Sequence, residues 1–293
     1  MGTHGWERFA HPVGTTEITE RHTERVLGVL VCIAWFASLA FITSVASLPA
    51  VDAHTSDFAL THRTAPIDGL MAAVSLIGGG EIMTLVAAFA AVGLVLAGRW
   101  RSAVFITVAF VAAELLAPAL RTGFMRAGPP GDYRPMLVLS RSIDVIWLGA
   151  ALVAVVAAAP TRWRWTAVLA ASLFVAIIGV DHLGLRILDT PDEFDSFPSG
   201  HLIRTSVVVA SLALVLWHTR RRNALIVAGG ALLVLTAISR VYLGAHYPTD
   251  VLAGIAVGVG VALLVSLVPG LDPLRSGAAP APAEEGSPEL ART

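Results

Sequence analysis

The fold is decided by two polar blocks near the end of the chain, PSGH at 198–201 and SRVYLGAHYPTD at 239–250. Each block is followed by an apolar segment of helix length. In the first block Pro and Gly punctuate a turn and Ser199 is a favourable N-cap, so a helix is expected to begin there. In the second, Arg240 ends one apolar segment and Asp250 begins the next. The blocks therefore predict helix ends that carry polar side chains.

The composition is that of a membrane protein. Of 293 residues, 56% are hydrophobic and only 14% are charged, and the mean hydropathy is +0.75. The 20 basic residues are all Arg. A formal net charge of −1 gives no reason to expect a nucleic-acid partner. The single cysteine, Cys32, cannot form an internal disulfide and is expected to serve packing.

Apolar runs recur along the chain, several of them near the length of about 20 residues that a bilayer requires. They predict an all-α polytopic membrane bundle with about eight transmembrane helices. The expected spans are 26–48, 70–97, 103–120, 143–160, 165–183, 202–217, 223–238 and 251–268.

Arginines in the connecting loops predict the orientation, because positively charged loops remain cytoplasmic. Arginines gather in the N-terminal tail, at 98–102, at 161–164 and at 220–222, which are alternate loops on one side. Both termini are therefore expected in the cytoplasm and both polar blocks outside. The expected divisions are a cytoplasmic tail (1–25), a transmembrane domain (26–270) and a disordered cytoplasmic tail rich in Pro, Ala, Glu and Ser (271–293).

The residue types in the two blocks suit phosphate chemistry without a metal. A helix that begins at the first block directs free amide groups outward, where an anion is favoured. Gly200 permits close approach to the backbone, and His201 is placed to transfer a proton. Arg240 can bind phosphate oxygens, while Asp250, four residues after His246, can orient that imidazole.

On these motifs the chain resembles the type 2 phosphatidic acid phosphatases, a superfamily that also includes the vanadium haloperoxidases. The family's second signature is Pro-Ser-Gly-His, and its third is Ser-Arg, five residues, His, three residues, Asp; both are present without a departure. The resemblance implies that His246 attacks phosphorus, that His201 protonates the leaving oxygen and that Asp250 supports His246. It also implies that Ser199, Gly200 and Arg240 hold the phosphate oxygens and that no metal or other cofactor is needed.

The family's first signature, Lys, six residues and Arg-Pro, matches less well. With Arg121 in the place of the Lys, the Arg-Pro pair becomes Gly128-Pro129, and Arg126 matches an additional Arg of the family. Arg186 is a second candidate for the Lys position but has no Arg-Pro behind it. We expect Arg121 and Arg126 to bind phosphate.

This assignment places two extra spans between the first and second signatures, whereas the family normally has six spans in all. It also leaves one phosphate ligand missing. Arg134, Arg186 or Arg204 could take its place, and Arg204 lies one helical turn past His201.

Three further features lie within apolar runs. Glu81 and Glu114 are acids that should face the bundle interior, either as partners of site arginines or as locally hydrogen-bonded carboxyls. Glu114 lies two turns before Arg121, on the same helix face. The glycines at 78–80 are expected to serve packing or a bend.

Together these features predict an integral membrane lipid phosphatase of the plasma membrane whose site faces outward. Polyprenyl diphosphates such as undecaprenyl diphosphate, phosphatidate and phosphatidylglycerol phosphate are all compatible substrates. Two alternatives stay open: a lipid phosphotransferase with the same site, and a lipid-binding protein that has lost activity. The sequence does not give the oligomeric state.

Overall fold

The computed structural model describes residues 15–46, 48–130 and 196–274 of the chain. These ranges form helices and contain no β-sheet. The helices are α1 (Thr15–Val45), α2 (Ala50–Thr61), α3 (Ala65–Ile77), α4 (Gly80–Leu96), α5 (Trp100–Phe124), α8 (Gly200–Val215), α9 (Arg222–Tyr242) and α10 (Pro248–Ser266).

Five stretches of the described residues are long and apolar enough to cross a membrane, and α8 is a shorter apolar helix. The five are Glu20–Val45, Ala65–Leu96, Trp100–Phe124, Arg222–Tyr242 and Pro248–Ser266. The predicted all-α membrane bundle is confirmed. Two of the eight expected spans, 143–160 and 165–183, lie outside the described residues, so the number eight stays a prediction.

The structure differs from expectation in the first loop and in the second span. Helix α2 forms within the loop expected at 49–69. It was not expected because its sequence mixes polar and apolar residues and contains no apolar run. The expected span 70–97 is divided into α3 and α4 at Gly78 and Gly79. A Cβ on Gly78 would lie 2.2 Å from the hydroxyl oxygen of Thr236, so this glycine allows α3 to end directly against α9. The glycine run thus serves packing and a bend, as expected.

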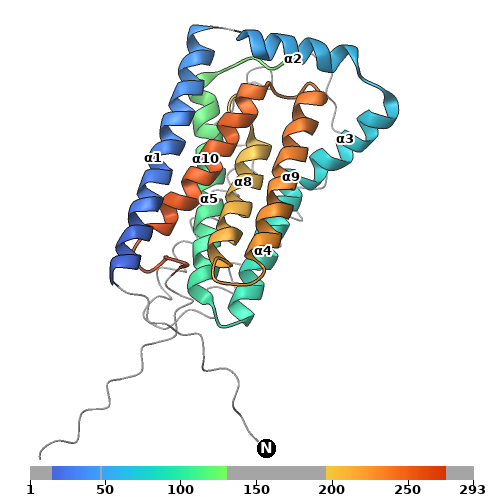
Figure 1. Ribbon diagram of the computed structural model, residues 1–293. Helices are drawn as coiled ribbons and strands as arrows, with labels where there is room; N and C mark the ends of the chain where they lie inside the picture. Colours follow the sequence, from blue (N-terminus) through green and yellow to red (C-terminus); the bar gives the residue numbers. More distant parts are fainter. Residues whose placement is uncertain (1–14, 47, 131–195, 275–293) are drawn as a thin grey trace, which may run out of the picture.

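Most of the helices run side by side, and α2 lies across one end of the bundle (Figure 1). At this end, called the α2 end below, α9 is joined to α10 by a short turn. The guanidinium of Arg99, at the start of α5, donates to the carbonyl oxygen of Val215 at 2.9 Å. That contact places the beginning of α5 beside the end of α8, at the opposite end of the bundle.

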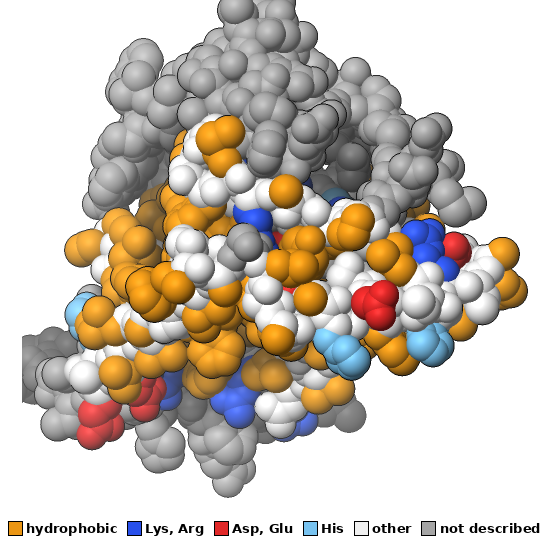
Figure 2. All heavy atoms as spheres, turned by 90° about the horizontal axis from the view of Figure 1, so that it is seen from above, with side chains coloured by type: hydrophobic (Ala, Val, Ile, Leu, Met, Phe, Trp, Pro, Cys, Tyr) orange, Lys and Arg blue, Asp and Glu red, His pale blue; other side chains and the backbone are white. Residues whose placement is uncertain are grey.

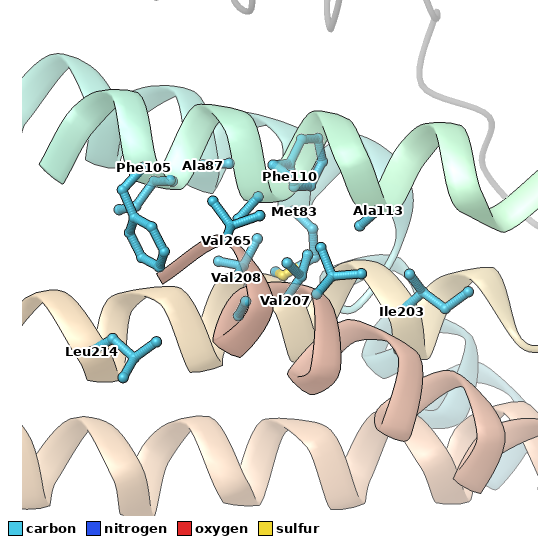
Figure 3. Packing of buried hydrophobic residues seen from close by; sticks show 14 of the residues in the cluster. Met83, Ala87, Phe105, Phe110, Ala113, Ile203, Val207, Val208, Leu214 and Val265 are labelled. Carbon is cyan, nitrogen blue, oxygen red and sulfur yellow. The ribbon is translucent and has the colours of Figure 1, made fainter. Parts of the chain in front are cut away.

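Helix α8 lies at the centre and packs on α10, α9, α5 and α4. Figure 3 shows the core between them, with Phe105 and Phe110 of α5 near Val207 and Val208 of α8 and Val265 of α10. Lipid tails are as apolar as these side chains, so close packing between the helices, rather than burial from water, holds the membrane-spanning helices together.

Two glycines of α10 bring it into backbone contact with α8. A Cβ on Gly254 would lie 2.6 Å from the carbonyl oxygen of Ser199, and one on Gly258 would lie 2.4 Å from that of Ile203. Small residues four apart allow this close approach between membrane helices. The amide of Ser199 also donates to the carbonyl oxygen of Asp250 at 3.0 Å. The two polar blocks are thereby fixed against each other.

Candidate active site

The first part of the candidate site is the start of α8. Gly200 is buried there, and a Cβ on it would lie 2.1 Å from Nη2 of Arg121 and 3.4 Å from Nη1 of Arg204. Arg121 also donates from Nε to the carbonyl oxygen of Pro198 at 3.4 Å. Two guanidinium groups therefore lie over the first turn of the helix, beside amide groups that favour an anion.

The second part is the turn between α9 and α10. Gly244 takes the left-handed conformation with φ of +70°, which glycine adopts without strain. The amides of Ala245 and His246 both donate to the carbonyl oxygen of Arg240, at 3.0 and 3.3 Å. This closure of α9 fixes the backbone of His246. The Arg240 guanidinium is buried and donates to the hydroxyl of Ser75 on α3 at 3.0 Å.

The two parts meet at His201, which is partly buried in the first turn of α8. The ring of His201 interacts electrostatically with four nearby groups, which are Arg240, Arg204, His246 and Arg121. The side chains from the two sequence blocks thus lie together with Arg121 at the α2 end of the bundle.

The environment of His246 favours a neutral imidazole with a defined tautomer. Its ring lies 2.8 Å from the carbonyl oxygen of Ser196, measured from Nδ1. A carbonyl only accepts, so Nδ1 carries the proton and Nε2 keeps its lone pair. Burial, followed by the charges of Arg240 and Arg121, lowers the pKa of His246 well below its ordinary value, against the opposing effect of the Ser196 carbonyl.

Asp250 does not make the contact with His246 that was expected. Its Oδ2 lies 3.9 Å from Nδ1 of that ring, beyond hydrogen-bond distance. Oδ2 instead accepts hydrogen bonds from the hydroxyl of Ser196 and from the amide of Tyr247, the latter at 2.8 Å. Ser196, two residues before the first block, occupies the place next to the imidazole that was expected for the carboxylate.

Arg126, expected to bind phosphate, is held by carboxylates instead. Its Nη2 donates to Oδ2 of Asp52 at 2.7 Å, and its Nη1 donates to Oδ1 of Asp250 and to the hydroxyl of Thr249. The guanidinium stacks over the ring of Tyr247, 4.5 Å from its centroid. Arg126 is 9% exposed, and Asp52 is fully buried. The sequence could not place Asp52 beside Arg126, and phosphate binding by Arg126 stays a prediction.

Arg204 is held by Glu114, which accepts from its Nε at 2.5 Å and from its Nη2 at 2.8 Å. Such two-point pairing orients a guanidinium strongly. Of the two interpretations of Glu114, the structure supports the partner of a site arginine. The described pairing is with Arg204 of α8 rather than with Arg121 on its own helix.

The remaining predicted residues are placed as follows. Ser199 is fully buried, and its hydroxyl oxygen finds no hydrogen-bond partner in the part of the chain that is described. Arg134 and Arg186 lie outside the described residues. The roles of Asp52, Ser196 and Thr249 were missed. Asp52 and Ser196 lie outside the two blocks, and Thr249 lies in the second block at a position that the motif leaves open. The only available signal for Asp52 was an acid in the first turn of a short helix.

Comparison with known proteins finds related chains. The model of the PAP2 superfamily matches residues 180–271. Phosphatidylglycerophosphatase B of Bacillus subtilis is 39% identical over 82 residues, which cover 26% of this chain and 39% of that protein. Lipid A 1-phosphatase of Rhizobium johnstonii is 41% identical over 75 residues, covering 26% of this chain and 28% of that protein. The chain thus spans less than half the length of these curated relatives.

A longer match is to decaprenylphosphoryl-5-phosphoribose phosphatase of Mycobacterium tuberculosis, 32% identical over 136 residues that cover 42% of this chain and 72% of that protein. Among solved structures, the crystal structure of a transmembrane PAP2 type phosphatidylglycerolphosphate phosphatase from Bacillus subtilis has a TM-score of 0.53 at 19% identity. That match covers 81% of this chain and 94% of the other. With both signatures in place and most of one relative aligned, the chain belongs to the PAP2 superfamily.

Proposed function

We propose that this protein is a membrane phosphatase that removes a phosphate group from an amphiphilic phosphate monoester or diphosphate. The observation that carries the proposal is the convergence of His201 and His246 with Arg121 and Arg240 at the start of α8. Two imidazoles beside several guanidinium groups supply a nucleophile, a proton donor and a binding site for a phosphoryl group.

In the proposed reaction, the Nε2 lone pair of His246 attacks phosphorus. An N–P bond forms, the P–O bond to the leaving group breaks, and His201 gives a proton to the leaving oxygen. The negative charge of the bound phosphate favours the protonated form of His201 beforehand. Water then attacks the phospho-histidine as His201 takes its proton, the N–P bond breaks, and inorganic phosphate leaves. Arg121 and Arg240 stabilise the charge on the transferred group. No metal takes part in this proposed sequence of steps.

An amphiphilic substrate fits the position of the site at the ends of apolar helices. Hydrophobic side chains predominate on the described part of the face at the α2 end (Figure 2). The relatives described above are named as phosphatases of phosphatidylglycerophosphate, of lipid A at its 1-phosphate and of decaprenylphosphoryl-5-phosphoribose, all of them lipid phosphates. We therefore infer that the headgroup lies at the helix ends and the lipid chain between or beside the helices.

The decisive experiment measures phosphate release by the purified protein from a panel of these lipid phosphates. We expect wild type to be active, and His246→Ala and His201→Ala to lose nearly all turnover. His218→Ala is the matched control, since His218 is an exposed histidine that follows α8 at the opposite end. Turnover that survives in His246→Ala, or that collapses on adding EDTA, would contradict the proposed chemistry. Absence of phosphate release from every lipid in the panel would contradict the function itself.

The site is proposed to face away from the cytoplasm. Arg99 and the arginines at 220–222 adjoin the end of the bundle opposite to α2, and positively charged loops favour the cytoplasm. In a Cys32→Ser background, a membrane-impermeant thiol reagent added to intact cells should label His54→Cys on α2 but not Arg220→Cys. The reverse pattern would overturn the orientation.

A further inference from the structure

We infer that Asp52, Arg126 and Ser196 form a positioning relay that, through Asp250, fixes the orientation and tautomer of His246. The inference rests on the proposed role of His246 as the nucleophile. Asp52 and Arg126 lie outside the segment that the family model matches, 180–271.

The first link of the relay is Ser196, which is 3% exposed and is held at three points. Its amide donates to the carbonyl oxygen of Arg126 at 3.2 Å, its hydroxyl donates to Oδ2 of Asp250, and its own carbonyl accepts from Nδ1 of His246 at 2.8 Å. A peptide group fixed in this way can hold the imidazole in one orientation. Removal of the hydroxyl breaks the connection to the carboxylate while leaving the carbonyl in the chain.

The second link joins Asp250 to α2 through Arg126. Asp52 accepts from Arg126 at 2.7 Å, and also from the amide of Thr249 at 3.2 Å and its hydroxyl at 2.6 Å. Thr249 immediately precedes Asp250, so Asp52 fixes both the guanidinium that pairs with the Asp250 carboxylate and the residue next to Asp250 in the chain. A buried ion group of this kind is costly to desolvate and needs its full set of partners to be maintained.

The relay also places charge behind the nucleophile. Two carboxylates against one guanidinium leave one excess negative charge when both acids are ionised. As Nε2 attacks phosphorus, the imidazole acquires positive charge, which that excess stabilises. Several charged or titratable groups surround the ring of His246, and all of them contribute to its pH response. They are Arg121 from α5, His201 from α8, Arg240 from α9 and Asp250 from α10.

The relay is tested first with Ser196→Ala and Ser196→Thr. Removal of the hydroxyl is expected to lower kcat about tenfold, with KM changed much less, because the binding groups remain. The threonine variant, which keeps a hydroxyl, should recover most of the loss. An alanine variant with wild-type kcat would overturn the relay.

The second test is Asp52→Asn, with Asp57→Asn as its control, since Asp57 is an exposed acid on the same helix. Loss of one negative charge disfavours the protonated imidazole, so the acid limb of the kcat/KM profile should move to lower pH. A purely structural role for Asp52 would lower activity without moving that limb, and such a result would contradict the inference. If Asp52→Asn does not fold, the Ser196 variants decide the question alone.

A third readout does not depend on turnover. In 15N-histidine spectra of the protein in micelles, the signal assigned through His246→Gln should show a single Nδ1–H tautomer in wild type. Ser196→Ala should show exchange between tautomers. If wild type releases no phosphate, the proposed function is contradicted, but this comparison still tests the relay. An unchanged tautomer in Ser196→Ala would contradict the relay.

Discussion

Substitution of Gly258 by alanine is the sharpest test of the contact between α8 and α10. The new Cβ would lie 2.0 Å from the hydroxyl oxygen of Ser206, 2.4 Å from the carbonyl oxygen of Ile203 and 2.9 Å from the amide of Val207. Ordinary contact begins at 3.4 Å, so the shortfall against the Ile203 carbonyl is about 1 Å. A hydroxyl can rotate away, but a helical carbonyl cannot, and the two helices must therefore separate.

Overpacking of this kind costs about 1–3 kcal/mol of stability. The separation also reaches the candidate site, because Ser199 and Asp250 are joined by a backbone hydrogen bond one to two turns away. A displacement of about 1 Å at the reacting groups lowers activity by up to 100-fold. We expect Gly258→Ala to lower both the thermal midpoint in detergent and the rate of phosphate release.

The matched control is Gly230→Ala on α9, where no atom lies within 4 Å of the new Cβ. That variant should retain both stability and activity. A Ser206→Ala change added to Gly258→Ala should restore only part of the stability, since the contact with Ile203 remains. A Gly258→Ala protein with wild-type stability and turnover would refute the argument that backbone contact sets the spacing of these helices.

Three further predictions concern the site. Because burial and nearby arginines hold the folded pKa of His246 below its value of about 6.5 in the unfolded chain, the unfolding free energy should fall as the pH drops through 6.5. Chemical denaturation at pH 7.5 and 5.5 should show a smaller fall in His246→Gln than in wild type, and an equal fall would contradict the prediction. Gly200→Ala should raise KM, because the Cβ of the new alanine would displace the flexible guanidinium of Arg121. The thermal midpoint should change little. An unchanged KM would show that this guanidinium does not contact substrate. Arg204→Ala should lower kcat/KM about tenfold or more, as expected for loss of a charged hydrogen bond of about 1.5–3 kcal/mol. Glu114→Gln should have a smaller effect. Intact turnover in Arg204→Ala would show that Arg204 does not bind substrate.

The helix class and the helix ends at the two polar blocks could be predicted from the sequence because both are local. Apolar runs mark most of the helices, and the PSGH turn begins α8 as the residue types require. The approach of His201 to His246 also followed, since both stand at helix ends on the same side.

The partners of the site arginines could not be predicted in the same way. Glu114 lies seven residues from Arg121 but pairs with Arg204, 90 residues away, because the packing of α5 on α8 decides the pairing. Asp52 lies 74 residues before Arg126 in a segment without an apolar period. Such pairs depend on which helices pack against each other, and the spacing of residues along one helix does not predict that packing.

The ion pair between Asp52 and Arg126 should affect how these two positions vary among related chains. Removal of one partner leaves a buried charge uncompensated, which is far more costly than replacing both together. Homologous chains that lack an acid at position 52 should therefore also lack a guanidinium at position 126, and the two positions should change as a unit during divergence. Because Arg126 also pairs with Asp250, substitutions in α2, in the segment after α5 and at the start of α10 should depend on one another.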